Sequence, residues 1–379
     1  MAKKYRVGII GHAGRGDYGH GLDLVQADVA NIDIVAVADV DQAGLRAAGE
    51  RTGAASLYPN YWDMLQHEKL DLVSVAPRFV DQHADMLLAC AEAGVKGVFC
   101  EKPMAKTLQE ADAVLAACEK SGMRIAVAHR RANAYEQRVK SLIEAGELGD
   151  IHTITSRGKG DHRVGGQDLA VLGTHMMDSM RYFAGADVDW VFGAVTQNGR
   201  DATIEDAREG NEGIGLIAGD RISATFGFNN GIIGHFESVH IPDEDGLAHA
   251  RWFGLEVHGT KGIVTVRNSP AGEMHIYRHG MWIPGNPTEW EVVKIDTWDY
   301  DDDGNERSGG DQMHLSNNWI VTELIKAIEA DQEVTQASSG YDARAALEMI
   351  MGIHESHLQQ QRVSFPLAER ENPYGVRLA

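Results

Sequence analysis

The residues with the clearest capacity for chemistry are Glu101, Lys102 and Pro103, which follow the apolar run Val95–Cys100. A residue that precedes proline is pushed out of the helical region, so we expect Lys102 to be extended and its amine to be aimed by a fixed backbone. The bond before Pro103 is also one of the few peptide bonds that can be cis. Such a lysine could stabilise a developing alkoxide, although charged residues at a strand end often only meet water.

A glycine-rich segment near the N-terminus follows the predicted strand Tyr5–Ile10. It has the dinucleotide-binding spacing G-x-G-x-x-G, except that alanine stands at the second glycine, where the backbone approaches a pyrophosphate. One methyl group is the smallest possible departure, and glycines also form ordinary turns. The residues that we predict to bind a dinucleotide here are Gly11, His12, Ala13, Arg15 and Gly16.

Asp39 ends the second predicted strand, Ile32–Ala38, 23 residues after Gly16. This is close to the ~20-residue interval that separates the fingerprint from the acid that binds the adenosine ribose. A carboxylate accepts hydrogen bonds from both ribose hydroxyls and repels a 2′-phosphate, and the next residue is Val40 rather than arginine or serine. We therefore predict NAD rather than NADP as the cofactor; the alternative is that Asp39 is a turn carboxylate.

Strand and helix patterns alternate in the first third of the chain, which is typical of a parallel sheet covered by helices and of the α/β class. We assign residues 1–128 to this cofactor-binding domain. The predicted strands are Tyr5–Ile10, Ile32–Ala38, Leu72–Ala76, Val95–Cys100 and Arg124–Ala128, and the predicted helices include Gln82–Ala93 and Leu108–Ser121.

From about Ile151 the pattern changes to one helix followed by alternating segments, which predicts an α+β domain with a mostly antiparallel sheet. We assign residues 129–379 to this second domain, whose C-terminal segment could pack back on the first. The predicted elements are the helix Gly166–Gly185, the strands Val191–Gln197, Arg221–Phe228, Ile232–Val239, Trp252–His258 and Gly262–Val266, and the helices Asn317–Ala330 and Tyr341–Gln361.

The composition is that of an ordinary globular protein, with 43% hydrophobic and 24% charged residues. The net charge of −21 argues against nucleic acids and anionic membranes as partners. The three cysteines lack metal-ligand spacing and indicate a reducing compartment. With no signal-peptide core and no apolar run of ~18 residues, we expect a cytoplasmic location.

Taken in order, these motifs resemble the glucose–fructose oxidoreductase / inositol dehydrogenase (Gfo/Idh/MocA) family, and the resemblance covers nearly the whole chain. The residues that carry it are Gly11–Gly16, Asp39, Ala76-Pro77, His83, Glu101-Lys102-Pro103, Gly165-Gly166, Gly173, His175, Asp178, Gly259–Gly262, Ala345–His357, Arg362-Val363 and Pro366-Leu367.

This resemblance implies an N-terminal Rossmann domain and a C-terminal domain whose open sheet often mediates oligomers, so we expect a homodimer or homotetramer. It also implies nicotinamide-dependent chemistry on sugars, cyclitols or related compounds. By the same resemblance Lys102 and His175 are catalytic, Pro77, His83 and Glu101 flank the cofactor, and the Lys102-Pro103 bond is cis.

The chain departs from the family at Val171, because many members have a carboxylate four residues before the histidine. In an α-helix Asp168, seven residues before His175, comes within about 20° of the same face and about 10 Å away along the axis. Asp178 lies one turn further on. We hypothesise that Asp168 and Asp178 bind substrate hydroxyls; the alternative for Asp168 is a first-turn acid favoured by the helix dipole.

His175 is the natural base for the hydroxyl proton, since its ordinary pKa of about 6.5 lets it accept a proton near neutrality. Lys102 would hydrogen-bond the same oxygen. Further substrate contacts are expected from Arg131, and from Lys159 and Arg163 in the segment before the helix, although a solvated charged loop explains that segment equally well.

The favoured function is oxidation of a ring secondary hydroxyl of a sugar, sugar derivative or cyclitol to a ketone. The alternative is a redox-assisted lyase, glycosidase or epimerase with tightly held NAD, and a third possibility is a cofactor-binding regulator. No metal site is predicted: the acidic loop that begins at Asp299 has Gly310 where calcium needs glutamate. His354 and His357 lack the spacing of a zinc helix.

Overall fold

The computed structural model describes residues 4–240, 252–267 and 273–378. The chain forms two compact units. The first contains Met1–Ala132, Glu212–Ile214 and Met313–Arg344, and the second contains Asn133–Asn211, Gly215–Gln312 and Ala345–Ala379. The boundary therefore falls four residues after the expected 128/129 division, and a late segment of the chain belongs to the first unit.

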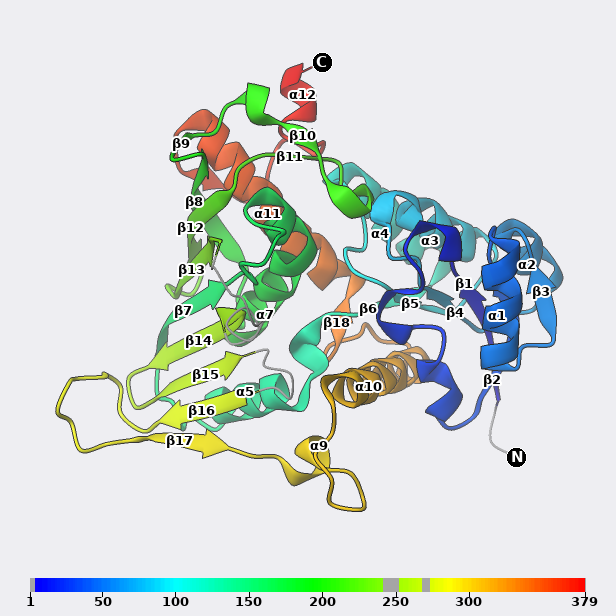
Figure 1. Cartoon of the computed structure of the whole chain (residues 1–379), viewed down its shortest axis with the longest axis horizontal. Coiled ribbons are helices and arrows are strands. Elements are labelled where there is room, and N and C mark those ends of the chain that lie inside the picture. Colours follow the sequence, from blue (N-terminus) through cyan, green and yellow to red (C-terminus); the bar gives the residue numbers. More distant parts are fainter. Residues whose placement is uncertain (1–3, 241–251, 268–272, 379) are drawn as a thin grey trace. The chain divides into compact units, whose positions relative to one another are not determined.

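The first unit contains a mainly parallel sheet that, over the described residues, runs in the order β18-β6-β5-β4-β1-β2-β3 (Figure 1). Among the described strands of this sheet, β18 alone is antiparallel to its neighbour. This confirms the predicted parallel sheet. Its strands are β1 (Tyr5–Ile10), β2 (Ile32–Ala38), β3 (Ser56–Tyr58), β4 (Leu72–Val75), β5 (Gly97–Cys100), β6 (Arg124–Val127) and β18 (Ser338–Ser339).

The connecting helices begin and end at residues of the expected types. Thr107 caps α4 by accepting a hydrogen bond from the amide of Glu110, and Gly122 ends the same helix with a φ of 77°. The helices of this unit are α1 (Gln42–Thr52), α2 (Tyr61–His67), α3 (His83–Glu92), α4 (Leu108–Ser121) and most of α10 (Gly309–Ala330).

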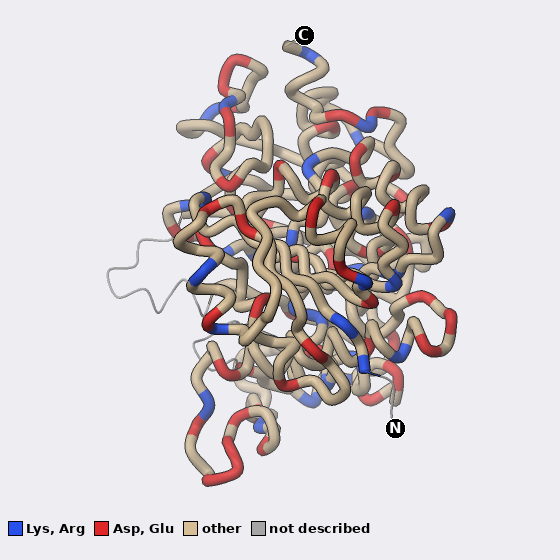
Figure 2. The backbone as a smooth tube through the Cα atoms, turned by 90° about the vertical axis from the view of Figure 1, so that its right-hand side faces the viewer, with Lys and Arg blue, Asp and Glu red and all other residues tan. Residues whose placement is uncertain are grey.

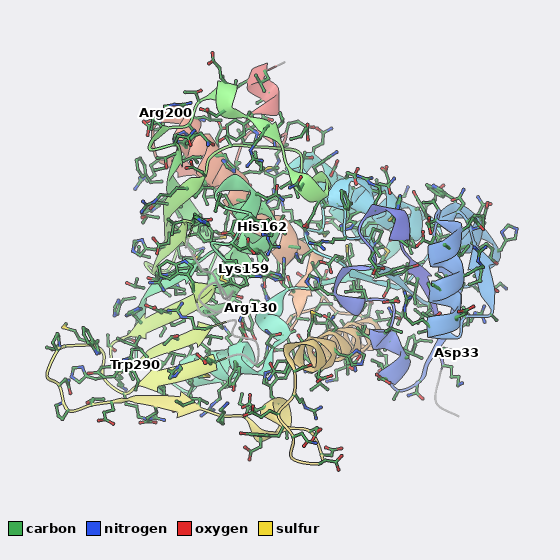
Figure 3. All side chains as sticks on the ribbon, in the orientation of Figure 1. Asp33, Arg130, Lys159, His162, Arg200 and Trp290 are labelled. Carbon is green, nitrogen blue, oxygen red and sulfur yellow. The ribbon has the colours of Figure 1, made fainter. Side chains whose placement is uncertain are left out.

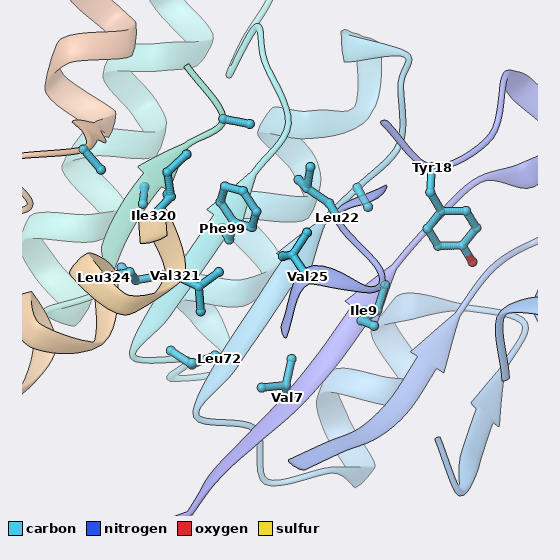
Figure 4. Close-up of a cluster of buried hydrophobic side chains, with 14 of the residues drawn as sticks. Val7, Ile9, Tyr18, Leu22, Val25, Leu72, Phe99, Ile320, Val321 and Leu324 are labelled. Carbon is cyan, nitrogen blue, oxygen red and sulfur yellow. The ribbon is translucent and has the colours of Figure 1, made fainter. Parts of the chain in front are cut away.

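Helix α10 packs its apolar residues into the core beneath the sheet (Figure 4). Ile320, Val321 and Leu324 are buried with Val7 and Phe99 from the strands. The three cysteines, Cys90, Cys100 and Cys118, are also buried and unbridged. The late segment is therefore an integral part of the cofactor-binding unit.

The second unit contains a larger, mostly antiparallel sheet, as predicted, in the order β17-β16-β15-β14-β7-β13-β12-β8-β19 over the described residues. The pair β13–β7 is the parallel exception. The strands are β7 (Ile151–Arg157), β8 (Val188–Gln197), β12 (Arg221–Phe228), β13 (Ile233–Ser238), β14 (Gly254–Gly259), β15 (Ile263–Arg267), β16 (Glu273–Tyr277), β17 (Trp290–Val293) and β19 (Val363–Ser364), with β9 (Arg200–Asp201) beside β8.

Helices cover one face of this sheet: α5 (Ala134–Glu144), α7 (Thr174–Ala184) and α11 (Gly340–Gln359) (Figure 1). Ser156 faces this layer, because its hydroxyl contacts the sulfur of Met180 in α7. Alternation places Arg157 on the opposite face, where it pairs with Glu237 and Glu256. That face is therefore polar and charged.

The predicted helix Gly166–Gly185 is not a regular α-helix. It consists of α6 (Gly166–Asp168), a π-helical stretch at Leu169–Gly173 and α7. No helix of the described residues is long and apolar enough to cross a membrane. Acidic residues outnumber basic ones along the chain (Figure 2).

Candidate active site

The carboxyl edge of the parallel sheet brings together most of the residues that were predicted to bind the cofactor. The glycine-rich turn follows β1, Asp39 follows β2, Pro77 lies two residues after β4, and Glu101 follows β5. Because β5, β4, β1 and β2 are neighbours in the sheet, these residues lie along one edge, which is where open α/β sheets bind ligands.

The glycine-rich turn is tight but is not followed by an α-helix. Ala13–Arg15 form a single 3₁₀ turn, and Gly16 has a φ of 96°, a conformation that glycine adopts readily. Two more 3₁₀ segments follow, at Gly19–Gly21 and Val25–Asp28. A helix dipole aimed at the pyrophosphate, which the fingerprint normally provides, is therefore absent from residues 13–28, and we expect the turn's own amides to replace it.

Asp39 lies where the acid that binds the ribose is expected. Its Oδ2 accepts a hydrogen bond from the amide of Ala13 over 2.9 Å, and its Oδ1 accepts one from the amide of Asp41 over 2.8 Å. The first bond ties the acid to the glycine-rich turn, and the second is a local turn contact. Asp39 is thus both a turn carboxylate and a part of the nucleotide edge.

Tyr18 is a residue of this edge that the sequence analysis missed. Its hydroxyl donates a hydrogen bond to Oδ2 of Asp39 over 3.0 Å. Its ring covers Gly11, where an added Cβ would lie 2.1 Å from the ring, and Arg51 lies over the ring at 5.3 Å. Burial and the nearby Asp39 raise the pKa of Tyr18 far above its usual value, so the phenol keeps its proton.

The residues of this edge fit NAD. Asp39 is tied to the glycine-rich turn where an acid for the ribose is expected, the turn amides lie where the pyrophosphate is expected, and the Nδ1 atom of His12 is buried without a hydrogen-bond partner among the described residues. Arg15 is less available than predicted, because its guanidinium pairs with Asp81 over 2.9 Å and lies over Phe79.

The Glu101-Lys102-Pro103 segment is almost completely buried, with side-chain exposure of 1% for Glu101 and 5% for Lys102. The Lys102-Pro103 peptide bond is cis, as the resemblance predicted. Lys102 Nζ lies 3.8 Å from Oε1 of Glu101, whereas both carboxylate oxygens lie within 2.9 Å of His20 Nδ1. Burial alone would raise the pKa of Glu101, but the charge and hydrogen bond of His20, with Lys102 beyond, outweigh it and lower that pKa.

His83 contacts this segment through both ring nitrogens, and its place beside the cofactor, which the resemblance implied, stays a prediction. The residue is fully buried. Its Nε2 lies 2.8 Å from the carbonyl oxygen of Pro77, and its Nδ1 lies 2.8 Å from that of Pro103. Burial lowers the pKa of His83, although both carbonyl oxygens favour its protonated form. The imidazole therefore ties the end of β4 to the residue after Lys102.

In the second unit, His175 lies in the first turn of α7 and Asp178 is fully buried one turn further on. The π-helical stretch changes the geometry expected for Asp168. With i→i+5 hydrogen bonds, the chain rotates less per residue than in an α-helix. The seven residues from Asp168 to His175 therefore do not complete two turns. The predicted shared face is therefore wrong.

Asp168 anchors the loop that precedes it instead of lying open to a substrate. Its carboxylate accepts hydrogen bonds from the amides of Lys159 and Gly160 and, over 2.6 Å, from the hydroxyl of Ser238. The side chain is fully buried, and burial raises the pKa of its carboxyl. This geometry argues against the hydroxyl-binding role that we hypothesised for Asp168.

The cations predicted to bind substrate are paired within their own units. Lys159, labelled in Figure 3, and Arg163 share the carboxylate of Asp161, with Nζ at 3.4 Å and Nη2 at 2.5 Å. Burial opposes ionisation of Asp161, but the hydrogen bonds and charge of Arg163 dominate and hold its pKa far below the usual range. Arg131 is buried and lies 3.3 Å from Asp342.

Within the described residues, no group of three or more histidine, cysteine or acidic side chains is arranged to hold a metal ion. In the acidic loop, Asp301 accepts hydrogen bonds from the amides of Asp303 and Asn305. This carboxylate organises its own turn.

Comparisons with known proteins agree with this architecture. Residues 5–129 match the model of the oxidoreductase family with an NAD-binding Rossmann fold, and residues 137–265 match the Gfo/Idh/MocA C-terminal domain. An uncharacterised oxidoreductase of Bacillus subtilis, YrbE, is 29% identical over 71% of this chain and 75% of its own length.

A myo-inositol 2-dehydrogenase of Thermotoga maritima is 30% identical over 49% of this chain and 57% of its own length. Among solved structures, levoglucosan dehydrogenase in complex with NADH and levoglucosan superposes with a TM-score of 0.74, covering 96% of this chain and 100% of that one. At 19% identity, that match shows a shared fold. With both of its family domains matched in sequence and its nucleotide edge in place, the chain belongs to the Gfo/Idh/MocA family of NAD-binding oxidoreductases.

Proposed function

We propose that this protein is an NAD-dependent dehydrogenase that oxidises a ring secondary hydroxyl of a sugar, sugar derivative or cyclitol to a ketone. The observation that carries the proposal is the buried Lys102, held next to a cis proline on the same sheet edge as Asp39 and the glycine-rich turn. The relatives named for inositol and levoglucosan support the substrate class. They are named as dehydrogenases, and no observation favours the lyase or epimerase alternative.

In the proposed mechanism, bound NAD supplies a hydride acceptor. Lys102 donates a hydrogen bond to the reacting oxygen and stabilises negative charge as it develops there. His175 accepts the hydroxyl proton as the general base. Asp39 and the amides of the glycine-rich turn hold the adenosine half of the cofactor. We propose that Asp178, Arg131, Lys159 and Arg163 line the substrate side, the last three through ion pairs that a substrate would have to share.

The test is NADH formation with a panel of pyranosides, free sugars and inositols, with product analysis of the same samples. A signal that is lost in Lys102→Met and in His175→Ala, while both variants still bind NAD, supports the proposal. Product without net NADH would instead indicate the redox-neutral reaction. Full activity in Lys102→Met would refute the catalytic assignment.

We also propose a homo-oligomer, a dimer or tetramer, and a cytoplasmic location. The polar face of the large sheet, with its ordered pairs around Arg157, and the exposed Phe192 on β8 support assembly. The free, buried cysteines support a reducing compartment. Light scattering coupled to size-exclusion chromatography would test the first proposal, and fractionation of the native host would test the second.

A further inference from the structure

His20 contacts Glu101, the residue before the proposed catalytic lysine, and was not among the residues predicted to form the site. Its Nδ1 atom lies 2.8 Å and 2.9 Å from the two carboxylate oxygens of Glu101. Since a carboxylate can only accept, this nitrogen carries a proton whichever charge state the ring has. His20, Glu101 and Lys102 thus form a row of three groups. The side chain of His20 is 38% exposed, whereas those of Glu101 and Lys102 are 1% and 5% exposed.

The backbone at His20 is built to hold this position. The residue has a φ of 47°, a left-handed conformation that costs a residue with a side chain free energy. Its carbonyl oxygen accepts a hydrogen bond from the buried side chain of Asn317 in α10. The preceding Gly19 approaches so closely that an added Cβ would lie 2.7 Å from Glu101. The hydrogen bond from Asn317 and the close approach of Gly19 to Glu101 therefore both help to hold the imidazole against the carboxylate.

Glu101 is closer to His20 than to Lys102. Both of its oxygens are within hydrogen-bond distance of His20, while Lys102 Nζ remains at 3.8 Å, beyond that distance. In a buried site, a glutamate and a lysine side by side attract each other strongly. Without a competing donor, the carboxylate would close on the ammonium and occupy hydrogen-bonding capacity that a substrate oxygen needs.

We propose that His20 is a positioning residue for Lys102: it holds the Glu101 carboxylate so that the lysine ammonium is directed to the substrate rather than to its neighbour. The inference rests on the proposed function, since it takes Lys102 as the group that contacts the reacting oxygen. It assigns His20 no contact with substrate.

The decisive variants are His20→Gly and His20→Gln. Glycine removes the imidazole and tolerates the positive φ, so the backbone is not strained further. Glutamine keeps an N–H donor that can reach a carboxylate. We expect kcat to fall about tenfold in His20→Gly, the equivalent of one charge-assisted hydrogen bond, with the Kd for NAD and the melting temperature nearly unchanged. His20→Gln should recover most of the loss.

A second readout does not depend on turnover. The rate at which acetic anhydride labels Lys102, followed by peptide mass spectrometry, should fall in His20→Gly as Glu101 closes on the amine. Labelling of Lys96, a half-exposed lysine paired with Asp71 in the same unit, serves as the internal reference. The matched control is His314→Ala, which removes a histidine–carboxylate pair with Asp28 from the same unit and should change neither readout.

The outcomes separate this inference from the proposed function. If Lys102→Met is inactive but His20→Gly turns over and labels like wild type, the role of His20 is refuted and Lys102 stands. If Lys102→Met is active, the proposed function itself fails. A glutamine variant as impaired as the glycine variant also overturns the inference. Should His20→Gly not fold, His20→Leu replaces it: an apolar side chain of similar size cannot donate to Glu101, and wild-type turnover and labelling in this variant refute the role of His20.

Discussion

Tyr18 and Ala13 donate hydrogen bonds to the same oxygen of Asp39, the phenol over 3.0 Å and the amide over 2.9 Å. Each carboxylate oxygen has about two acceptor sites, so Oδ2 is filled, and the amide of Asp41 takes one of the two sites on Oδ1. The acid that was expected to accept both ribose hydroxyls therefore has a single conventional site left for them. If Asp39 binds the ribose, as we propose, we expect Tyr18 to affect how tightly NAD is bound.

Tyr18→Phe should tighten NAD binding about three- to tenfold, because the phenol no longer competes for Oδ2 of Asp39. NADP should bind more weakly. Without the Tyr18 hydroxyl, the negative charge of Asp39 is less well compensated and repels the 2′-phosphate of NADP more strongly. Titration of the apoprotein with each cofactor measures both. Tyr5→Phe is the matched control, because it removes a similar bond to Glu329 in the same unit; equal affinities in Tyr18→Phe and wild type would contradict the argument.

Asp39→Ser should shift the ratio of kcat/KM for NADP over NAD upward by about tenfold or more, because the charge that repels a 2′-phosphate is removed while a hydroxyl remains for the ribose. Parallel kinetics with both cofactors measure the shift. A wild-type protein that already prefers NADP tenfold would show that the acid does not select NAD.

Asp168→Asn should destabilise the protein by about 1–3 kcal/mol. The carboxylate accepts three hydrogen bonds, two of them from amides on different oxygens. An asparagine has one oxygen, so its NH₂ group must face a donor. Urea unfolding of the two proteins gives the difference. If kcat/KM falls while stability is retained, Asp168 acts on the substrate after all.

The stability gap between wild type and Asp168→Asn should depend on pH in one direction. Burial raises the pKa of the Asp168 carboxyl above its usual 3.8. The folded state therefore holds this proton more tightly than the unfolded state, and the resulting stabilisation is complete below the unfolded pKa and is lost as the pH rises through the folded one. The gap should widen as the pH is lowered from neutrality towards 4, and a gap that narrows would contradict this assignment.

Local patterns predicted the parallel sheet and the residues at its carboxyl edge, because strand runs and turn residues are read over a few positions. β1 and β2 occur at the predicted residues, and Asp39 and Lys102 follow their strands as expected. The helix behind the glycine-rich turn is absent, and in this segment Asp17 and His20 have positive φ. Three glycines within Gly16–Gly21 make a helix costly, which was a signal available in the sequence.

The partners of the site residues could not be read from the sequence, because they depend on contacts between distant segments. Asp168 is fixed by Ser238, 70 residues later, and the carbonyl of His20 is fixed by Asn317. The π-helical stretch has no sequence signature that we recognise. Residue types and spacing therefore identified the lysine and the acid, but not the side chains that restrain them.

The sharing of Asp161 by Lys159 and Arg163 has a consequence for which molecules this protein admits. Because Lys159 and Arg163 are already paired with Asp161, their charges are not available to neutralise an anionic substrate. A phosphorylated or carboxylated sugar would have to displace Asp161 from these ion pairs and leave its carboxylate unpaired. A neutral polyol can form hydrogen bonds while the three side chains stay paired. If Lys159 and Arg163 line the substrate side, as we propose, this shared ion pair selects by charge, and we expect uncharged rings to be preferred over their acidic derivatives.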